Sequence, residues 1–356
     1  MELRTLRLEQ LRNVVTASIE LGGGVNLIEG ANGAGKTSVL EAISLISNGA
    51  SFRTHRTQDL IARDAARLRV VADFSTGGFA HRAGYERGRD GVRSLRLDGA
   101  NAARQSEISR LMPTLVIAPE TFAVVAGGPG GRRRMIDWGL YHRDAEFHPL
   151  WSQYRRALAQ RNALLRARAV PAQIAPWSLE LLRWAAPLDG ARKAYVAELA
   201  GTLPAVLDQL SGLPPISLVY RQGWREAGEL AELLDAEAKQ PRRSQSTTRY
   251  GPHVAELDLL ADGVPAREHL SRGQQKLLVY ALKLAQLELF HRHRGRGCAV
   301  LCDDLPAELD PQRLGQVVAL VRARAGQVLM TSATPGAVTS PDRMFHVEHG
   351  RISQVI

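Results

Sequence analysis

The chain has 356 residues, of which 45% are hydrophobic, so it is long enough to form two domains with buried cores. Lysine and arginine together number 46 against 36 acidic residues, and the formal net charge of +10 favours polyanionic partners such as nucleic acid. Arginine supplies 41 of these cations, an excess that codon bias in a GC-rich genome explains equally well. Composition therefore argues against a disordered chain but does not identify a partner.

The cysteine content and the hydropathy pattern favour an intracellular location without a membrane anchor. Cys298 and Cys302 are the only cysteines, and they share one short apolar run, which is typical of a reducing compartment. Charged residues interrupt the first ten positions, which excludes the apolar core of a secretory signal there. Because no uncharged apolar run reaches about 18 residues, we expect a cytoplasmic protein with no membrane partner.

The first third of the chain has the alternating pattern of short strands. Glycine-rich and Asp-Gly turns separate the apolar runs, as expected of a β-rich region. The predicted strands are residues 2–8, 25–29, 67–74 and 94–97.

From Arg132 onward, apolar residues recur at spacings of three and four, which predicts helices. A second helical stretch is expected over 178–210, after a break marked by the prolines at 171 and 176, and a strand is expected over 216–220. The pattern predicts an α/β protein in three parts. These are an N-terminal head segment over 1–120, a helical arm over 121–209, and a C-terminal head segment over 210–356.

Residues 30–37 match the phosphate-loop pattern G-x-x-x-x-G-K-[ST] at every fixed position, between a strand-like run and a helical run. In such loops the backbone N–H groups surround a triphosphate at a helix N-terminus. Lys36 is expected to reach the β- and γ-phosphates and to act in catalysis, and Thr37 is expected to place its hydroxyl on Mg²⁺. The residues expected to bind ATP are Gly30, Ala31, Asn32, Gly33, Ala34, Gly35, Lys36, Thr37 and Ser38.

A second motif supplies the acidic residues that a nucleotide site requires. Residues 298–302 have the pattern of a buried strand, and Asp303 and Asp304 follow directly. With the phosphate loop present, Asp303 is expected to hold Mg²⁺ through its water shell and Asp304 to be the general base for the attacking water. Two acidic residues after an apolar strand are also a common strand cap. The 267 residues between Lys36 and Asp303 indicate a large insertion between the two motifs.

A third motif, Leu-Ser-Arg-Gly-Gln-Gln-Lys over residues 270–276, opens a long helical run. Ser271 and Gln274 have the spacing of a capping box, so one interpretation is simply a well-capped helix. In the other interpretation, Ser271, Gly273 and Gln274 bind a phosphate at the helix N-terminus. A Ser-x-Gly-Gln segment about thirty residues before an Asp-Asp strand resembles the ATP-binding-cassette (ABC) arrangement, in which it completes the site of the opposite subunit.

Over nearly its whole length the chain resembles the RecF family, bacterial recombination-mediator ATPases related to the heads of SMC-type proteins. Besides the phosphate loop, the resemblance rests on Tyr154 and on residues 51–54, 128–137, 160–165, 251–253, 270–278, 303–305 and 308–310. It implies an ABC/SMC-type P-loop ATPase head with an inserted α-helical arm. It also implies ATP and Mg²⁺ as cofactors, and a homodimer that forms when ATP bridges the phosphate loop of one subunit and the Ser271 segment of the other.

The resemblance further implies a weak, DNA-stimulated ATPase of recombinational repair and replication restart, associated with the nucleoid. Such proteins bind duplex DNA in the ATP state, at gaps or single-strand/duplex junctions, and act with RecO and RecR to help load RecA. Residues 308–310 would signal between the two ATP sites, although a polar turn before a helix starting at Pro311 explains them equally well. The alternatives are an ABC-type ATPase subunit of a transporter and a nucleotide-gated scaffold that does not bind DNA.

Three positions depart from the usual patterns. Thr331 stands where transporter cassettes carry a histidine that contacts the γ-phosphate, and Glu120 stands near a glutamine that touches the metal in many cassettes. Val254, Ala255 and Glu256 follow His253, where the family usually continues with an arginine.

The expected DNA-binding residues lie in the arm. Residues 121–209 hold 12 basic and 7 acidic residues, half of the net charge of the chain. Arg132, Arg133 and Arg134 begin one predicted helix, and a basic surface there would face phosphates. A solvated helix face, or a contact that holds the arm onto the head, explains these three equally well. The further arginines of the predicted surface are at positions 155, 156, 161, 166 and 168.

Overall fold

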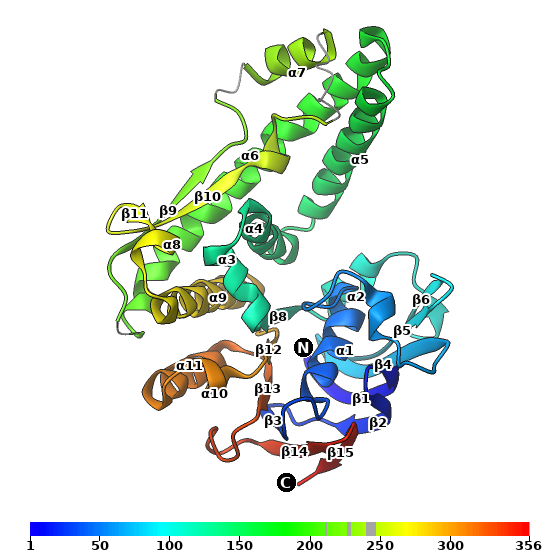
Figure 1. The fold of residues 1–356 in the computed structure, drawn as a ribbon, viewed down its shortest axis with the longest axis vertical. Helices are drawn as coiled ribbons and strands as arrows, with labels where there is room; N and C mark the ends of the chain where they lie inside the picture. The colour runs from blue at the N-terminus through cyan, green and yellow to red at the C-terminus, as the bar shows by residue number, and fades with distance from the viewer. Residues whose placement is uncertain (211, 226–228, 240–246, 356) are drawn as a thin grey trace. The chain divides into compact units, whose positions relative to one another are not determined.

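The computed structural model describes residues 1–210, 212–225, 229–239 and 247–355 (Figure 1). The chain divides into two compact units. The first unit comprises Met1–Phe122, Ala205–Ser211 and Lys276–Ile356, and the second comprises Ala123–Pro204 and Gly212–Gln275. None of the helices in the described ranges is long and apolar enough to cross a membrane.

A six-stranded, mostly parallel sheet forms the centre of the first unit, in the order β15-β14-β3-β13-β12-β8. All residues of β3, β12 and β13 are buried, as expected for parallel strands covered on both faces. Because β3, β8, β12 and β13 run in the same direction, their carboxyl ends meet at one edge. The strands are β3 (Val25–Glu29), β8 (Thr114–Ile117), β12 (Ala299–Cys302), β13 (Gln327–Ser332), β14 (Arg343–Glu348) and β15 (Arg351–Gln354).

A six-stranded antiparallel sheet, in the order β2-β1-β4-β5-β6-β7, makes the second layer of this unit. Helix α1 (Lys36–Asn48) contacts β1, β4 and β5 of this sheet and β8 and β13 of the parallel one, so it packs between the two layers. The strands are β1 (Glu2–Leu11), β2 (Val14–Glu20), β4 (Arg67–Thr76), β5 (Phe79–Gly88), β6 (Arg93–Leu97) and β7 (Ala100–Asn101). The helices α2 (Gln105–Leu111), α10 (Leu305–Glu308) and α11 (Pro311–Arg324) and two 3₁₀ turns, Thr57–Leu60 and Pro119–Phe122, complete the unit.

The second unit is mainly helical and also contains a small antiparallel sheet, β11-β10-β9. The buried side chains of Leu165 on α5, Ile174 on α6 and Ala238 on α7 pack together. Its helices are α3 (Ala123–Ala126), α4 (Pro129–Arg143), α5 (Phe147–Arg166), α7 (Glu229–Lys239) and α8 (Ala266–His269), its strands β9 (Ile216–Arg221), β10 (Glu256–Ala261) and β11 (Val264–Pro265), and its 3₁₀ turn Pro252–Val254. Helix α6 (Pro171–Leu207) ends in the first unit, and α9 (Arg272–Arg294) begins in the second and continues in the first.

The structure departs from the three-part prediction in residues 212–275, which were expected in the head and instead belong to the second unit. Strand β9 pairs with β10, and α4 packs on β10. An ion pair between Arg132 and Glu256 reinforces this packing (2.7 Å). The partners are 35 to 45 residues apart in the β9–β10 pairing and 124 apart in the Arg132–Glu256 pair, so no local pattern reports these contacts.

The predicted break between Pro171 and Pro176 is wrong, because α6 starts at Pro171 and continues through Pro176, Pro187 and Pro204. Proline is tolerated at the start of a helix but costs about 3 kcal/mol inside one. Burial of apolar side chains along α6, such as Leu181, Leu188 and Leu199, offsets that cost. Strands β2 and β5 were not predicted. Strand β5 carries His81, Arg82 and Gly84, which are poor strand signals.

Candidate nucleotide site

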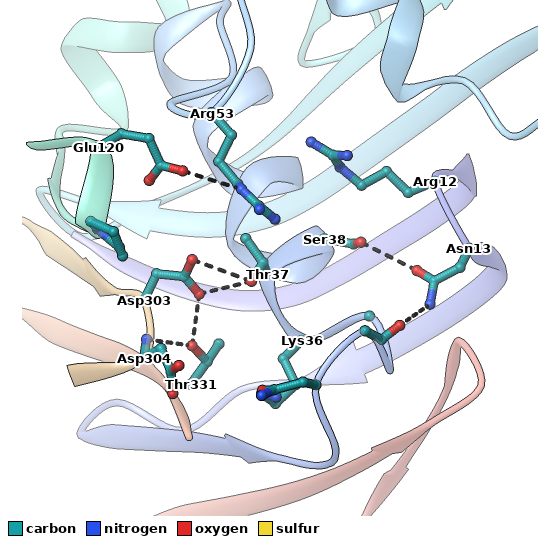
Figure 2. A pocket seen from close by; sticks show the side chains of 14 residues that line it. Arg12, Asn13, Lys36, Thr37, Ser38, Arg53, Glu120, Asp303, Asp304 and Thr331 are labelled. Carbon is teal, nitrogen blue, oxygen red and sulfur yellow. Dashed lines mark hydrogen bonds and ion pairs between the residues drawn. The ribbon is translucent and has the colours of Figure 1, made fainter. Parts of the chain in front are cut away.

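A cavity of about 540 Å³ lies where the carboxyl ends of the parallel strands of the first unit meet (Figure 2). Such edges are the usual ligand sites of open α/β sheets. Residues that follow β3, β8 and β12 line it, together with Thr331 near the end of β13. The lining residues are Arg12, Asn13, Asn32, Gly33, Gly35, Lys36, Thr37, Ser38, Arg53, Pro119, Glu120, Asp303, Asp304 and Thr331.

Two glycines of the phosphate loop are required by its conformation. Gly30 has φ +157°, and a Cβ there would lie 2.2 Å from the Val347 carbonyl oxygen. Gly35, the residue before α1, has φ +120°, and a Cβ there would meet the Asn13 amide at 3.0 Å. Among the described residues no side chain caps the start of α1, so no side chain blocks the approach of an anion to this helix N-terminus, where the Ser38 N–H donates to the Gly35 carbonyl (3.1 Å).

Lys36 is held inside the loop by its own backbone. Its Nζ donates to the carbonyl oxygens of Gly30 (2.8 Å) and Ala31 (3.0 Å), and the side chain is buried. An ammonium group satisfied only by neutral carbonyl groups can exchange them for phosphate oxygens, which are stronger acceptors. The structure therefore presents Lys36 beside the residues that the loop pattern assigns to phosphate.

Asp303 lies between two threonine hydroxyls (Figure 2). The hydroxyl of Thr37 donates to its carboxylate (2.9 Å to Oδ1), and the hydroxyl of Thr331 donates to Oδ1 at 2.8 Å. Burial raises the pKa of Asp303, against the opposing effect of these two hydrogen bonds. A buried, incompletely compensated carboxylate favours a bound cation.

The donor set fits Mg²⁺ better than a transition metal. The Thr37 hydroxyl and the Asp303 carboxylate, which are hydrogen-bonded to each other, both line the cavity. Magnesium ions keep several waters and take phosphate oxygens, so two protein oxygens suffice. In the part of the chain that the structure describes, no cluster of three or more His, Cys, Asp or Glu side chains forms a metal site.

Asp304 differs from its neighbour in backbone and in environment. Its φ of +53° is in the left-handed region, and its backbone N–H donates to the Thr331 hydroxyl (2.9 Å). Its carboxylate lines the cavity and, within the described part of the chain, accepts only a long hydrogen bond from the Ala333 N–H (3.4 Å). Thr331 therefore bonds to both acidic residues and fixes their relative position.

Asn13 and Arg12, in the turn between β1 and β2, are functional candidates that the sequence prediction missed. The Asn13 amide donates to the carbonyl oxygens of Gly33 (3.0 Å) and Ala34 (2.9 Å) of the phosphate loop. The Arg12 guanidinium binds the buried carboxylate of Glu41 on α1 through two hydrogen bonds (2.5 and 2.8 Å). Only the positive φ of Arg12 (+54°) marks this turn as unusual, and the sequence does not reveal it.

Arg53 is a second cation that lines the cavity. Its Nε donates to Glu120 (3.3 Å), which also lines the cavity. The Ser51 hydroxyl donates to Glu41 (2.5 Å) and accepts from the N–H groups of Arg53 and Thr54 (3.0 and 3.1 Å). The segment 51–54, already part of the family resemblance, is thereby fixed at the site.

The predicted signature residues belong to the second unit, so the first unit alone builds the cavity. The Ser271 hydroxyl accepts from the Gln274 N–H (3.3 Å), and the Gln274 side chain accepts from the Ser271 N–H (3.0 Å). This is the capping box that the local pattern predicts. Ser271 and Gly273 are exposed.

Residues 308–310 have local structural roles. Glu308 ends α10 and pairs with Lys276. Asp310 accepts from the Arg313 N–H (3.0 Å) and caps α11, in which Pro311 is the first residue. The simpler interpretation of this segment, a polar turn before a helix, is therefore confirmed.

The predicted DNA-binding arginines divide into buried and exposed groups. Arg132 binds Glu256 through two hydrogen bonds (2.7 and 3.0 Å), and Arg133 donates to the Ala255 carbonyl (2.7 Å), so both are engaged within the second unit. Arg134 is exposed. Arg132 and Arg133 hold α4 to the start of β10, a role that the sequence did not distinguish from DNA contact.

Arg161 was expected on a basic surface, and this prediction is wrong. Its side chain is fully buried and donates to Ser178 (2.9 Å), Thr248 (2.6 Å) and the Leu234 carbonyl (2.7 Å), and it pairs with Glu237 (3.1 Å). Helical spacing places Arg161 on the inner face of α5 with Leu165, four residues later. The exposed arginines of this region are at positions 155, 156, 166 and 168.

Comparisons with known proteins agree over the full chain. The family model for the RecF/RecN/SMC N terminal domain matches residues 2–354. A protein of Shewanella piezotolerans named DNA replication and repair protein RecF is 37% identical over 361 residues, which cover 100% of both chains. A protein of the same name from Shewanella sp. (strain W3-18-1) is 37% identical over 360 residues, again over 100% of both.

The fold is also that of solved structures. One, described as the recombination mediator protein RecF-ATP in the RecFOR pathway, superposes with a TM-score of 0.88 at 23% identity, over 100% of this chain and 98% of the other. An Smc head bound to the C-winged helix domain of ScpA gives 0.59 at 16% identity, over 100% of this chain and 97% of the other. The full-length match to the family model and to relatives at 37% identity shows that this chain belongs to the RecF family, within the wider RecF/RecN/SMC group.

Proposed function

We propose that the chain binds ATP with Mg²⁺ in the cavity of the first unit and hydrolyses it slowly. One observation carries most of this proposal. The phosphate loop, the Asp303–Asp304 pair and Thr331 come from three parts of the sequence, and they converge on one cavity at the carboxyl edge of the sheet. The family membership supports the same conclusion.

Different side chains of the cavity would bind the phosphates and the Mg²⁺ ion. Lys36 would exchange its bonds to Gly30 and Ala31 for β- and γ-phosphate oxygens, while the loop N–H groups and Ser38 complete the phosphate contacts. Thr37 and Asp303 would hold Mg²⁺, which when bound neutralises phosphate charge. Arg12 and Arg53 add positive charge at the rim, and Glu120 limits how far Arg53 reaches.

Asp304 would accept the proton of the attacking water. A general base needs a carboxylate that faces the substrate and has an acceptor oxygen free. Asp304 meets this condition, since among the described residues its carboxylate accepts only the long hydrogen bond from the Ala333 N–H. Asp303 does not, because hydroxyl donors from two sides occupy its oxygens.

We further propose that two copies dimerise when ATP lies between the phosphate loop of one and the Ser271 segment of the other, with Gly273 and Gln274 contributing. An exposed Ser271 hydroxyl and Gly273 backbone at a helix N-terminus are suited to a phosphate. The capping-box bonds would have to rearrange for this contact, so the bonded state is the one expected without nucleotide.

In the cell, the proposed role is in recombinational repair and replication restart in the cytoplasm, at the nucleoid. The chain would bind duplex DNA at gaps or single-strand/duplex junctions and act with RecO and RecR to help load RecA. The relatives named for DNA replication and repair favour this role over a transporter subunit. Arg134 and the exposed arginines 155, 156, 166 and 168 are the proposed phosphate contacts, and Arg132 and Arg133 are not.

Fluorescence anisotropy of labelled gapped and uninterrupted duplex, titrated over a range of salt, tests the DNA role. We expect binding that weakens as salt rises and that tightens at least tenfold with Mg²⁺ and ATP. Replacing Arg155 and Arg156 by Gln should reduce the salt dependence, whereas Arg96→Gln, an exposed change in the first unit, is the matched control. Equal affinity with and without ATP would contradict nucleotide-gated DNA binding.

A further inference from the structure

Two residues one helical turn apart on α9, Lys276 and Tyr280, contact two segments of the first unit that the cavity also uses. The Lys276 ammonium pairs with the Glu308 carboxylate and lies 5.7 Å from the centroid of the Phe122 ring. The Tyr280 ring meets the Phe122 ring edge-on, at 5.8 Å and 85°. We call these four residues, Lys276, Tyr280, Phe122 and Glu308, the Lys276 clamp.

The clamp contacts both segments just beyond residues that line the cavity. Phe122 ends the 3₁₀ turn that carries Glu120, and Glu308 ends α10, which begins directly after Asp304. Lys276 and Tyr280 do not themselves line the cavity. Within one copy they can therefore act on the cavity through the backbone of these two segments.

Asp304 needs such support. A non-glycine residue in the left-handed region costs free energy and persists only where its surroundings hold it. The Thr331 hydroxyl holds the N-terminal side of Asp304 by accepting from its N–H (2.9 Å). On the C-terminal side stands α10, a single turn of four residues, which has little stability of its own.

Side chains at both ends anchor this turn, which also packs on β13 and α11, to the rest of the unit. Leu305 is fully buried at its start, and Glu308 reaches Lys276 at its end. Within the turn, the Ala307 N–H donates to the Asp304 carbonyl (3.1 Å). This hydrogen bond joins Asp304 to α10, so a movement of α10 would also move Asp304.

The polar groups of the clamp are arranged to keep Lys276 and Glu308 together. Their side chains are 34% and 19% exposed, so water screens this pair only in part. Burial raises the pKa of Tyr280, and the nearby carboxylates of Glu308 and Asp304 add to this effect. Tyr280 therefore stays uncharged and does not compete with Glu308 for Lys276.

We propose that the Lys276 clamp fixes the Asp304–Glu308 turn in the conformation needed for hydrolysis, so that Lys276 is a positioning residue and not an ATP ligand. This inference rests on the proposed role of Asp304 as the general base. It assigns a function to two motif positions, Lys276 and Glu308, that local sequence explains only as a helix start and a polar turn.

Three variants test the clamp: Lys276→Met, Glu308→Gln, and the charge swap Lys276→Glu with Glu308→Lys. Lys239→Met, which removes an exposed ion pair with Asp235 on α7, is the matched control. The first readout needs no nucleotide and is hydrogen exchange at the Ala307 amide. We expect exchange to rise at least tenfold in both single variants, to fall back in the swap, and to stay unchanged in α1.

The second readout is the single-turnover rate of ATP hydrolysis beside the ATP dissociation constant. We expect the rate to fall at least tenfold in each single variant while the dissociation constant stays within threefold, and the swap to recover at least a third of the parental rate. A lysine that only stabilised the fold would not lower the hydrolysis rate while leaving the ATP dissociation constant unchanged.

Two results would overturn the clamp. One is parental exchange at Ala307 together with a parental rate in Lys276→Met. The other is a loss of ATP affinity as large as the loss of rate, which would make Lys276 a ligand. If Ala307 exchange responds as expected while the parent hydrolyses no ATP, the clamp contacts are supported and the proposed ATPase activity fails.

Discussion

Asp303 and Asp304 are neighbours in sequence, yet the fold gives them different chemistry. Thr37 and Thr331 both donate to the buried carboxylate of Asp303, whereas Asp304 turns into the cavity from a left-handed backbone position. The first arrangement suits a cation and the second suits a proton acceptor. Both roles can be tested by replacing one carboxylate at a time.

Asp304→Asn should keep ATP bound while lowering the single-turnover rate of hydrolysis by about 100-fold or more, because it removes the proton acceptor and little else. Rapid quenching of a single turnover, alongside equilibrium ATP binding, measures both quantities. Gln312→Ala, an exposed change on α11, serves as the control. A rate within twofold of the parent would rule out Asp304 as the base.

Asp303→Asn should stabilise the chain at pH 7 in the absence of nucleotide and Mg²⁺, by about 1 kcal/mol. Burial raises the pKa of Asp303 in the folded chain above its unfolded value, so the ionised carboxylate opposes folding. The free-energy cost of the ionised Asp303 carboxylate is absent below the usual aspartate pKa of the unfolded chain. It grows as the pH rises from there through the raised pKa of the folded chain. Urea unfolding should show a higher free energy of unfolding for Asp303→Asn than for the parent at pH 7, and this difference should disappear near pH 4.

Added Mg²⁺ and ATP should make the parent more stable than Asp303→Asn, since only the parent can hold the ion. The same unfolding experiment with saturating Mg²⁺ and ATP gives the comparison. If Asp303→Asn is less stable than the parent at pH 7 without ligands, the carboxylate is not a strained cation site.

The difference between predictable and unpredictable residues of the site has a physical cause. Gly30 to Ser38, Asp303 and Asp304 are visible in the sequence because the loop and the strand end impose a local pattern. Asn13 and Arg12 are not, since their effect depends on a β-turn that reaches the loop only after β1 has joined the sheet. Arg53 was visible only as part of a family resemblance.

At the scale of elements, a buried polar network holds α5, α6 and α7 around the segment 247–256. Arg161 joins Ser178 on α6 to Glu237 and the Leu234 carbonyl on α7, and the Asn162 side chain accepts from the Thr248 N–H (2.7 Å). The two ring nitrogens of His253 form hydrogen bonds with the Tyr154 hydroxyl (2.6 Å) and the Thr248 carbonyl (2.9 Å). Burial lowers the pKa of His253, which favours the neutral ring that donates to Thr248 and accepts from Tyr154.

Arg161→Met should destabilise the second unit by about 3 kcal/mol, because the buried Glu237 carboxylate loses its buried partner and keeps only the more distant guanidinium of Arg249 (3.5 Å). Urea unfolding measures the change. Arg156→Met, on the exposed face of the same helix, should stay within about 0.5 kcal/mol of the parent.

The double variant Arg161→Met with Glu237→Leu should recover part of that loss, because it removes both charges. A single variant that unfolds like the parent would contradict the buried position of Arg161.

The elements themselves were predicted unevenly. Long amphipathic helices and the buried strand β12 follow from periodicity, and α4, α5 and β9 were found. The start of α6 was misplaced because its proline at 176 is a local stop signal that tertiary burial overrides. The assignment of 212–275 to the second unit depends on the pairing of β9 with β10, which no local window contains.

At the scale of the whole molecule, the proposed assembly requires a second copy, because the proposed ATP site combines the phosphate loop of one subunit with the Ser271 segment of the other. Ser271→Arg should leave ATP binding to the first unit unchanged but prevent the ATP-dependent dimer, since a bulky cation would stand where phosphate must approach. Sedimentation velocity with and without ATP gives the readout, and Arg267→Gln on α8 is a nearby exposed control. A dimer that forms as in the parent would exclude the shared site.

The central claim is that the cavity at the carboxyl edge of the sheet is an ATP site with Lys36 at its centre. Equilibrium binding of a fluorescent ATP analogue with Mg²⁺, compared between the parent and Lys36→Met, tests it most directly. We expect saturable binding by the parent and a loss of affinity of at least 100-fold in Lys36→Met, with both chains equally stable to urea. Equal binding by the two chains would contradict the account.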